Sequence, residues 1–519
     1  MFLYYNLGDM RTRKALVNML WSLFSYALLL IIGIVLRRFL LLQFDTEIIG
    51  YEGIIADIFS FIALADFGLD SLFNYRFYKA FAEDDEDRIN QLANMYKRLW
   101  NILGIIVFFT CVILYFVLPL IYGDKIAYWN IFKISFALYA LSVLSTYFFG
   151  YWRTILTASQ KEYKAIKVET IINFSSFAFK SAALLGLRSY ILYLIMNSFF
   201  IILSKIVVAF ISKREFPFYH YEKTSLSKFA EEGMMAECPQ LIMIKTADVV
   251  NWSSANLFTS LLIDVRSAAM YSNYAIIGGA VWSAIVSFLR PIRSTLADMI
   301  YKEEKEVSFA FYKMMDMACF FIATIILACY SVVFQPAITF FFGDEFLLPA
   351  SFVYAYAFLY YLAAKSEATN SFRECFGDYK TESVLSFFAI IVMIFISTMM
   401  SRYIGVGGIM IGTAVSYLLI WHSRKIILIK KFYGYPLIRS WLIELAYALL
   451  AVVELLMTGL ITIHISYGFV GMLIRGVIGV CVPTAINALI FRDSDLMKTV
   501  INFINTKIIK KNGEIIENE

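Results

Sequence analysis

The chain has 519 residues, of which 61% are hydrophobic and 16% are charged. This hydrophobic share far exceeds that of a soluble domain, so the composition excludes a soluble protein and indicates one embedded in a membrane. The formal net charge of +5 does not indicate nucleic-acid binding, because basic loops facing anionic lipid headgroups account for the excess.

Apolar runs long enough to cross a bilayer recur along nearly the whole chain. A spanning helix needs roughly 20 mostly apolar residues. The first eight runs cover 18–43, 49–75, 99–121, 129–151, 169–187, 190–211, 237–262 and 269–296. The others cover 317–341, 349–371, 382–401, 405–429, 441–464 and 469–491. The predicted fold class is therefore an all-α polytopic membrane protein with about fourteen transmembrane helices.

Polar residues repeat at a fixed offset in the two halves of the chain. Gly123-Asp124 ends one apolar run, and Gly343-Asp344 ends another 220 positions later. The same offset relates Tyr51 to Tyr271, Glu83 to Glu303, Glu86 to Glu306 and Arg153 to Arg373. We predict two pseudo-symmetric six-helix lobes, 1–215 and 216–435, then an appended helix pair at 436–492 and a cytoplasmic tail at 493–519. In transporters built from such repeats, the substrate site lies at the interface between the halves.

Lys and Arg are concentrated in alternate loops, which predicts the orientation of the chain. Short loops rich in these residues stay in the cytoplasm. The even-numbered connections between the runs carry most of the cations, among them Arg88, Lys97, Lys213 and Lys431. We therefore expect both termini to be cytoplasmic.

No pattern typical of an enzyme, a metal site or an ATPase is present. The six cysteines include no CxxC pair, and the three histidines are isolated near predicted membrane boundaries, so neither a disulfide framework nor a metal site is expected. The chain also lacks a Walker-type phosphate-binding loop. We expect no cofactor, and transport would depend on an ion gradient or on the imbalance of the substrate itself.

Cations inside the apolar runs are the candidate substrate-binding residues. A charge in hydrocarbon costs at least ~2.5 to 3.5 kcal/mol unless it faces a cavity or a partner. Arg37 and Arg38 point about 100° apart on a helix, so only one readily faces an interior. Positive charge in both halves suits an anionic group such as phosphate or pyrophosphate, while the alternative for each cation is an interhelical ion pair or an extension to the membrane surface. The predicted cationic cavity consists of Arg37, Lys180, Lys245, Arg290 and Lys365.

Acidic residues in the same runs are candidate carriers of a coupling ion, either H⁺ or Na⁺. These are Asp66, Asp248 and Glu367. Asp248 shares a helix face with Lys245, and this pair can neutralise itself. Lys365 and Glu367 are two positions apart and face nearly opposite ways, so each needs a partner elsewhere in the fold.

The residues after the first run carry a resemblance to a known family. Arg37-Arg38-Phe39 and the stretch IIGYEGIIADIFSFIALADFGLDSLFNYRFYKAFAEDDEDRI at 48–89 resemble the opening of bacterial polysaccharide flippases of the O-antigen type. Asp66 stands where that family has an acidic residue, before Gly68. The family belongs to the multidrug, oligosaccharidyl-lipid and polysaccharide exporter superfamily, and the resemblance covers essentially the whole chain.

The resemblance implies a flippase and not an enzyme. Such proteins move undecaprenyl-pyrophosphate-linked sugar repeat units from the inner to the outer leaflet of the bacterial cytoplasmic membrane, by alternating access between two lobes. It also implies a role in cell-surface polysaccharide assembly, with other assembly proteins as partners.

Three alternatives stay open at this point. A multidrug exporter of the same fold needs an acidic cavity for organic cations, and the first run contains no acidic residue. A polysaccharide polymerase or glycosyltransferase usually needs a sizeable outside loop, whereas every predicted outside loop is short. A scaffold of the assembly complex that does not transport is the third class.

Overall fold

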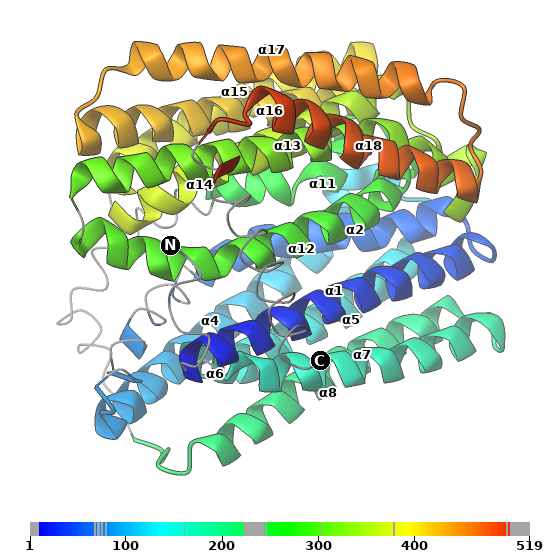
Figure 1. Ribbon diagram of the computed structural model, residues 1–519. Coiled ribbons are helices and arrows are strands. Elements are labelled where there is room, and N and C mark those ends of the chain that lie inside the picture. The colour runs from blue at the N-terminus through cyan, green and yellow to red at the C-terminus, as the bar shows by residue number, and fades with distance from the viewer. Residues whose placement is uncertain are drawn as a thin grey trace, which may run out of the picture. The chain divides into compact units, whose positions relative to one another are not determined.

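The computed structural model describes residues 10–66, 83–159, 161–222, 246–302, 304–376 and 379–494, with isolated positions between 67 and 82, at 243 and at 497–498. These residues are nearly all helical and include no strand. The first half contains α1 (Met10–Leu41), α2 (Thr46–Ile62), η1 (Ala63–Asp66), α4 (Glu86–Tyr122), η2 (Gly123–Lys125), α5 (Trp129–Phe149), α6 (Tyr151–Ala158), α7 (Glu162–Leu185) and α8 (Tyr190–Glu215) (Figure 1). The second contains α11 (Ala255–Leu262), α12 (Val265–Lys302), α13 (Lys305–Phe341), η3 (Asp344–Phe346), α14 (Ala350–Phe376), α15 (Tyr379–Ile404), α16 (Val406–Ile426), η4 (Ile427–Tyr433), α17 (Leu437–Thr462) and α18 (Phe469–Ile490).

The helices confirm the predicted fold class, a polytopic all-α membrane protein. Nine helices in the described residues are long and apolar enough to cross a membrane, namely α4, α5, α8, α12, α13, α15, α16, α17 and α18. Each of the predicted apolar runs coincides, in whole or in part, with a described helix. Large apolar side chains such as Phe116, Leu120 and Leu460 are strongly exposed, as expected for surfaces that face lipid.

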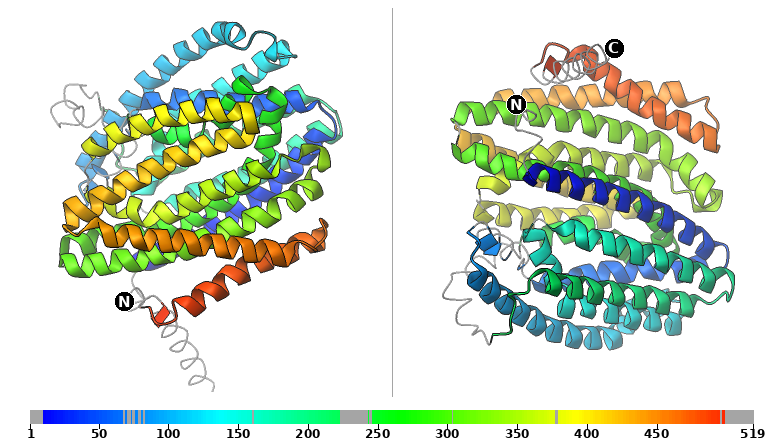
Figure 2. Two further views of the ribbon diagram at one scale, coloured as in Figure 1. Left: turned by 90° about the horizontal axis from the view of Figure 1, so that it is seen from above. Right: turned by 60° about the horizontal axis from the view of Figure 1, so that its bottom comes forward.

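The chain packs as two compact units. Unit 1 comprises Met1–Pro291 with Tyr379–Ile394, and unit 2 comprises Ile292–Asp378 with Phe395–Glu519. In unit 1, α7 packs on both α1 and α8, and α5 packs on α4 and α8 (Figure 2). In unit 2, α13 packs on α14, α17 and α18, and α14 packs on α16. The lobe boundaries at 215 and 435 stay a prediction.

The two Gly-Asp sequences have the same local setting. Gly123 follows α4 and Gly343 follows α13, and each of these helices has 37 residues with one internal proline. Both glycines have positive φ, +53° and +117°, a conformation that side chains other than that of glycine rarely adopt. The local structure therefore explains why glycine recurs at this point of the repeat.

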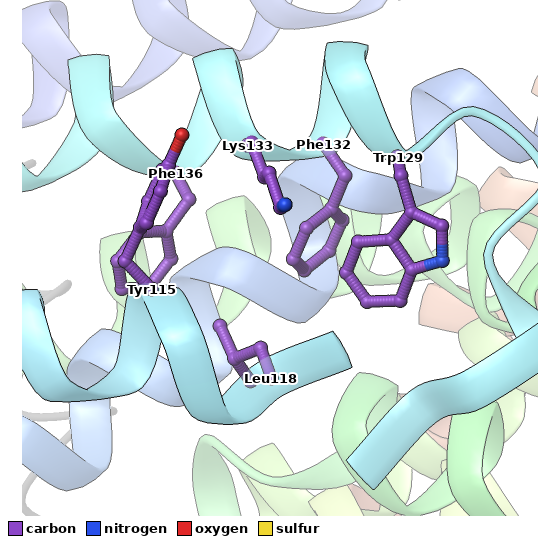
Figure 3. Close-up of a pocket in the computed structure, with 6 residues that line it drawn as sticks. All are labelled: Tyr115, Leu118, Trp129, Phe132, Lys133 and Phe136. Atoms are coloured by element: carbon purple, nitrogen blue, oxygen red, sulfur yellow. The ribbon is translucent and has the colours of Figure 1, made fainter. Parts of the chain in front are cut away.

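Aromatic side chains fill the contact between α4 and α5. Tyr115 and Leu118 of α4 face Trp129, Phe132, Lys133 and Phe136 of α5 across a shallow recess (Figure 3). The Lys133 Nζ lies 5.6 Å from the centre of the Tyr115 ring, and the Trp129 indole N–H donates to the Gly123 carbonyl at 3.1 Å. Apart from Lys133 the recess has apolar or aromatic walls, so it is a packing contact near the Gly-Asp turn.

Gly50 allows α2 to approach the start of α12 within unit 1. A Cβ atom at this position would lie 2.9 Å from the Val265 carbonyl oxygen and 3.2 Å from the Ala269 Cβ. The neighbouring helix glycine, Gly33 of α1, has room to spare, because its Cβ would meet only Ile276 at 3.5 Å. An added methyl group would therefore clash with the backbone at Gly50 but fit without a clash at Gly33.

Gly50→Ala is expected to destabilise the protein by about 1–3 kcal/mol, because the backbone carbonyl of Val265 cannot yield as a flexible side chain would. Gly33→Ala is the matched control and is expected to be neutral or stabilising by up to about 1 kcal/mol, since alanine is the better helix former. Unfolding of both purified variants in detergent measures the difference. Equal stability of the two variants would contradict the close helix approach.

A network of side chains ties the segment after α8 to the start of α4. Asn90 Oδ1 accepts from the His220 N–H at 3.1 Å, and Asn94 Nδ2 donates to the His220 carbonyl at 2.9 Å. The imidazole Nδ1 lies 3.0 Å from the Phe218 carbonyl, and Nε2 lies 2.7 Å from a Glu222 carboxylate oxygen. These two acceptors, with the carbonyl as the larger cause, raise the pKa of His220 above its ordinary value.

The raised pKa predicts a pH-dependent contribution of His220 to stability. A histidine with a raised pKa in the folded state stabilises it fully below its unfolded pKa of about 6.5, and this contribution is lost as the pH rises through the folded pKa. The difference in melting temperature between wild type and His220→Gln should therefore be largest in acid and shrink above neutrality. Thermal melts from acid to mildly alkaline pH measure it, and Glu222→Gln should remove part of the effect. A constant difference across this range would disprove it.

Candidate functional site

Unit 1 contains a band of polar side chains that are buried or half-buried between otherwise apolar helices. Burial of so many polar groups is expensive unless they pair or line a cavity. They come from α1, α2, α7, α8, α11 and α12. This polar band consists of Arg37, Glu52, Asp57, Lys180, Tyr193, Asn256, Ser272 and Asn273.

Arg37 joins three helices at one end of the polar band. Its Nε donates to Asn273 Oδ1 at 2.7 Å, and its Nη2 donates to the Ala269 carbonyl at 2.9 Å. A longer bond of 3.4 Å runs from Nη1 to the Ile49 carbonyl. Arg37 is only 5% exposed, whereas Arg38 is half-buried, which confirms that only one of the two arginines faces the interior. The Arg37 guanidinium therefore holds α1 against α2 and α12.

Glu52 lies between two cations. Its carboxylate interacts with Arg37 and Lys180, and it hydrogen-bonds with the Tyr193 side chain. Lys180 Nζ donates to Asn197 Oδ1 at 3.1 Å and lies 5.9 Å from the centre of the Tyr193 ring. Two positive charges thus share one negative charge. This part of the band keeps a net positive charge, which is the electrostatic condition for holding an anionic group.

Asp57 caps the short helix α11 from a neighbouring helix. Its Oδ2 accepts from the Leu257 backbone N–H at 2.8 Å, and its Oδ1 accepts from Asn256 Nδ2 at 3.3 Å. The first N–H groups of a helix lack partners within it, and its positive dipole end favours an anion. Ser272 Oγ donates to Asn256 Oδ1 at 2.7 Å. The Asp57 charge is therefore compensated locally by α11.

The span predicted over 237–262 is not one continuous helix. In the described part, residues 246–252 are helical and the chain leaves the helix at Ser253–Ser254 before α11 begins. Asn251 Nδ2 donates to the Ala247 carbonyl at 2.8 Å, and the Ser254 hydroxyl bonds to the Val250 carbonyl; such bonds compete with regular helix. Interrupted helices at membrane depth occur where protein buries them or where they line a cavity, and transporters use them at substrate sites.

Unit 2 contains a second buried polar group, a four-charge cluster of Asp316, Lys365, Lys425 and Glu444. Lys365 Nζ donates to Asp316 Oδ1 at 2.6 Å and to Glu444 Oε1 at 3.0 Å. Lys425 Nζ lies 3.6 Å from Asp316 Oδ2 and also pairs with Glu444. The two positive and two negative charges balance, and they come from α13, α14, α16 and α17. The cluster therefore neutralises itself.

Aromatic rings enclose the four-charge cluster. Lys365 Nζ lies 5.0 Å from the centre of the Tyr447 ring and 5.5 Å from that of Trp421, and Lys425 Nζ lies 5.6 Å from that of Trp421. Desolvated cation–π contacts of this kind add stability. The Lys365 side chain has no exposed surface, so a ligand would reach it only if the cluster opened. Its predicted contact with a substrate stays a prediction.

The other predicted site residues are dispersed. Glu367 of α14 is buried, Asp66 ends η1 half-buried, and Asp248 is exposed. All three interact with other groups of the chain. Lys245 and the Arg290 side chain lie outside the described residues. Of the five predicted cations, the structure places Arg37 and Lys180 around one carboxylate and Lys365 apart from them in unit 2.

Four acidic residues of these groups were absent from the sequence prediction: Glu52, Asp57, Asp316 and Glu444. Glu52 and Asp57 could have been identified from the sequence, because both are carboxylates inside the apolar run 49–75. Asp316 and Glu444 lie at or just outside the ends of predicted runs, where charges are ordinary. Their importance becomes visible only when the helices pack.

Comparison with solved structures shows which fold the chain has. The lipid II flippase MurJ, in an inward closed conformation, superposes with a TM-score of 0.65 at 15% sequence identity, covering 92% of this chain and 99% of that one. Inward-facing and outward-facing structures of a multidrug resistance MATE family transporter of the MOP superfamily give TM-scores of 0.59 and 0.58 at 12% and 11% identity. They cover 79% and 80% of this chain, and 96% and 95% of theirs.

No protein-family model matches the sequence, and no curated protein matches it. At these low identities the structural likeness shows the fold alone. The chain is a multi-pass membrane protein with the fold shared by MurJ and by MATE transporters of the MOP superfamily.

Proposed function

We propose that the chain is a flippase that moves undecaprenyl-pyrophosphate-linked oligosaccharides from the inner to the outer leaflet of a bacterial cytoplasmic membrane. The observation that carries the proposal is the excess positive charge at one part of the polar band, where the two cations Arg37 and Lys180 flank the single carboxylate of Glu52. Cationic donors bind pyrophosphate oxygens through strong, charge-assisted hydrogen bonds. The fold shared with a lipid II flippase supports this substrate class over an unrelated anion.

In the proposed mechanism two halves open alternately to each side of the membrane. The polar band holds the pyrophosphate, and its amides and hydroxyls contact the sugars. The polyprenyl tail stays in the lipid, which avoids moving a long apolar chain through a polar space. The transport step forms and breaks no covalent bond, so the chain acts as a transporter and not as an enzyme.

Energy coupling and cellular setting belong to the same proposal. Asp66, Asp248 and Glu367 are the candidate carriers of H⁺ or Na⁺. Both termini face the cytoplasm, and the protein works beside other proteins of surface polysaccharide assembly. The predicted cationic loops support this orientation, because positive loops are retained on the cytoplasmic side.

A second candidate function is the export of organic cations. Glu52 and Asp57 place two carboxylates in α2, and MATE transporters share the fold. A cation exporter needs acidic groups in its cavity. The first helix has none within the apolar run 18–43, which counts against an exporter, whereas Glu52 and Asp57 of α2 count in its favour. Arg37 and Lys180 oppose it, because they neutralise Glu52.

Transport by the purified protein in liposomes separates the two functions. A fluorescent sugar linked to undecaprenyl pyrophosphate is the probe for flipping, and a lipophilic cationic dye is the probe for export. We expect movement of the lipid-linked sugar between leaflets and no dye accumulation. Dye transport without lipid movement would overturn the flippase and support the exporter, and movement of neither probe would refute both.

A further inference from the structure

Glu454 is a buried acid of unit 2 that the proposed mechanism does not use. It lies in the middle of α17 on a stripe of buried residues, Tyr447, Ala451, Glu454, Thr458 and Thr462. This stripe faces the core of unit 2, as the contact of Tyr447 with Phe320 of α13 shows, with ring centres 4.2 Å apart. Glu454 is only 1% exposed. Its carboxyl group therefore lies inside the helix packing and not in lipid or water.

Hydrogen bonds to the Glu454 carboxyl group are missing. Neither carboxyl oxygen forms one with any group in the described part of the chain. The Thr324 hydroxyl of α13 interacts with this carboxyl group but forms no geometric hydrogen bond with it, and it donates to the Phe321 carbonyl at 3.2 Å. Asn487 of α18 donates its Nδ2 to Thr324 Oγ1 at 3.0 Å, while its own Oδ1 is buried without a donor. The site thus holds acceptors in excess of donors.

No positive charge compensates an ionised Glu454. Lys365 and Lys425 are balanced by Asp316 and Glu444 within the four-charge cluster. Other titratable groups on the helices packed here include Arg475 of α18, which donates to the Ile465 carbonyl, Cys329 of α13, and Tyr361 of α14. Among the described residues no ionised group acts on the Glu454 carboxyl. An isolated carboxylate in such a place is costly and becomes neutral by taking up a proton.

We propose that Glu454, Thr324 and Asn487 form a proton-binding site of unit 2, in which Glu454 is protonated at neutral pH. A protonated carboxyl supplies the donor that the site lacks, since one of its oxygens becomes an O–H group, and Thr324, which interacts with Glu454, is bonded to Asn487. The site lies where α17 and α18 pack on α13, so Thr324 belongs to the predicted C-terminal lobe, whereas Glu454 and Asn487 belong to the appended helix pair. If transport is coupled to protons, Glu454 is an alternative carrier to Asp66, Asp248 and Glu367. This coupling role rests on the proposed function, whereas the protonation of Glu454 does not.

Infrared spectroscopy of the full-length protein in liposomes tests the protonation directly. A protonated carboxylic acid has a C=O stretch that is distinct from the carboxylate bands. We expect wild type at neutral pH to show such a band that Glu454→Gln lacks. Glu444→Gln is the matched control on the same helix, because Glu444 is paired with Lys365 and Lys425, and this variant should keep the band. Equal bands in wild type and Glu454→Gln, or loss of the band in Glu444→Gln alone, would overturn the proposal.

Two further measurements keep this test independent of folding and of the flippase proposal. Glutamine has the shape of a neutral glutamic acid, so Glu454→Gln should melt within a few degrees of wild type; a collapse in stability would instead indicate an ionised, paired Glu454. In liposomes with an imposed pH gradient, Glu454→Gln should move the lipid-linked sugar probe without response to the gradient. Full gradient dependence in Glu454→Gln would remove the coupling role, whereas failure of wild type to move the probe would refute the flippase and leave the spectroscopic result standing.

Discussion

Replacing Lys365 by methionine is expected to lower the free energy of unfolding by about 3–5 kcal/mol, the usual effect of removing one partner from a buried ion pair. Lys365 has two carboxylate partners, Asp316 at 2.6 Å and Glu444 at 3.0 Å. Without it, the buried Asp316 and the half-buried Glu444 share the single charge of Lys425. The destabilisation comes chiefly from the uncompensated negative charge and not from the lost volume, because methionine fills a similar space.

A charge-balanced double variant separates these two causes. Lys365→Met combined with Glu444→Gln leaves the Asp316–Lys425 pair intact, so it should recover part of the stability lost in the single variant. Lys430→Met, at an exposed position just beyond α16, is the control and should stay within about 0.5 kcal/mol of wild type. Unfolding of the purified proteins in mixed detergent gives all three values. A loss below about 1 kcal/mol for Lys365→Met, or no recovery in the double variant, would contradict a tightly coupled cluster.

Lys180→Gln is expected to slow flipping of the lipid-linked oligosaccharide by roughly 10- to 100-fold. A hydrogen bond to a charged group contributes about 1.5–3 kcal/mol, and each ~1.4 kcal/mol corresponds to a factor of ten in rate. Lys180 is half-buried, and its removal leaves Glu52 to neutralise Arg37 alone. The part of the polar band around Glu52 then loses its net positive charge. Lipid-linked intermediates should accumulate on the inner leaflet of cells that express this variant at normal levels.

Lys133→Gln is the matched control for this prediction. Lys133 is also a half-buried lysine within a spanning helix, but it faces the Tyr115 ring in the recess between α4 and α5, and no residue of the polar band lines this recess (Figure 3). Flipping by this variant should stay within about twofold of wild type, since a peripheral lysine contributes less than ~0.5 kcal/mol. Wild-type flipping by Lys180→Gln, or an equal defect in both variants, would move Lys180 to a structural role.

Hydrophobic runs predict the helices of this chain well, because membrane insertion depends mainly on the composition of about 20 residues at a time. These runs do not predict a break in a helix when the break is caused by contact with a distant part of the chain. The break at Ser253–Ser254 is such a case, since α11 begins where Asp57, almost 200 positions earlier in the chain, accepts its free N–H groups. No local pattern around residue 254 encodes that partner.

Buried charges show the same limit. Spacing on a helix correctly indicates that Lys365 and Glu367 need partners elsewhere, and it separates Arg37 from Arg38. It does not identify Asp316 or Glu444 as partners, because they are 49 and 79 positions from Lys365. It also presents Lys365 as an unpaired cation, whereas the packed helices give it two carboxylates. Pairing between distant segments decides whether such a residue is available to a ligand.

The order of charges in the four-charge cluster constrains how the chain enters the membrane during synthesis. Along the chain the charges are negative in α13, positive in α14, positive in α16 and negative in α17. A single helix with an uncompensated charge partitions poorly into lipid, but the cluster charges of α13 and α14 cancel within one hairpin, and those of α16 and α17 cancel within another. The insertion machinery would therefore release these segments as hairpins. Exchanging the charges of Lys365 and Glu444 would preserve the total charge, yet each hairpin would then carry two cluster charges of the same sign at the moment of release.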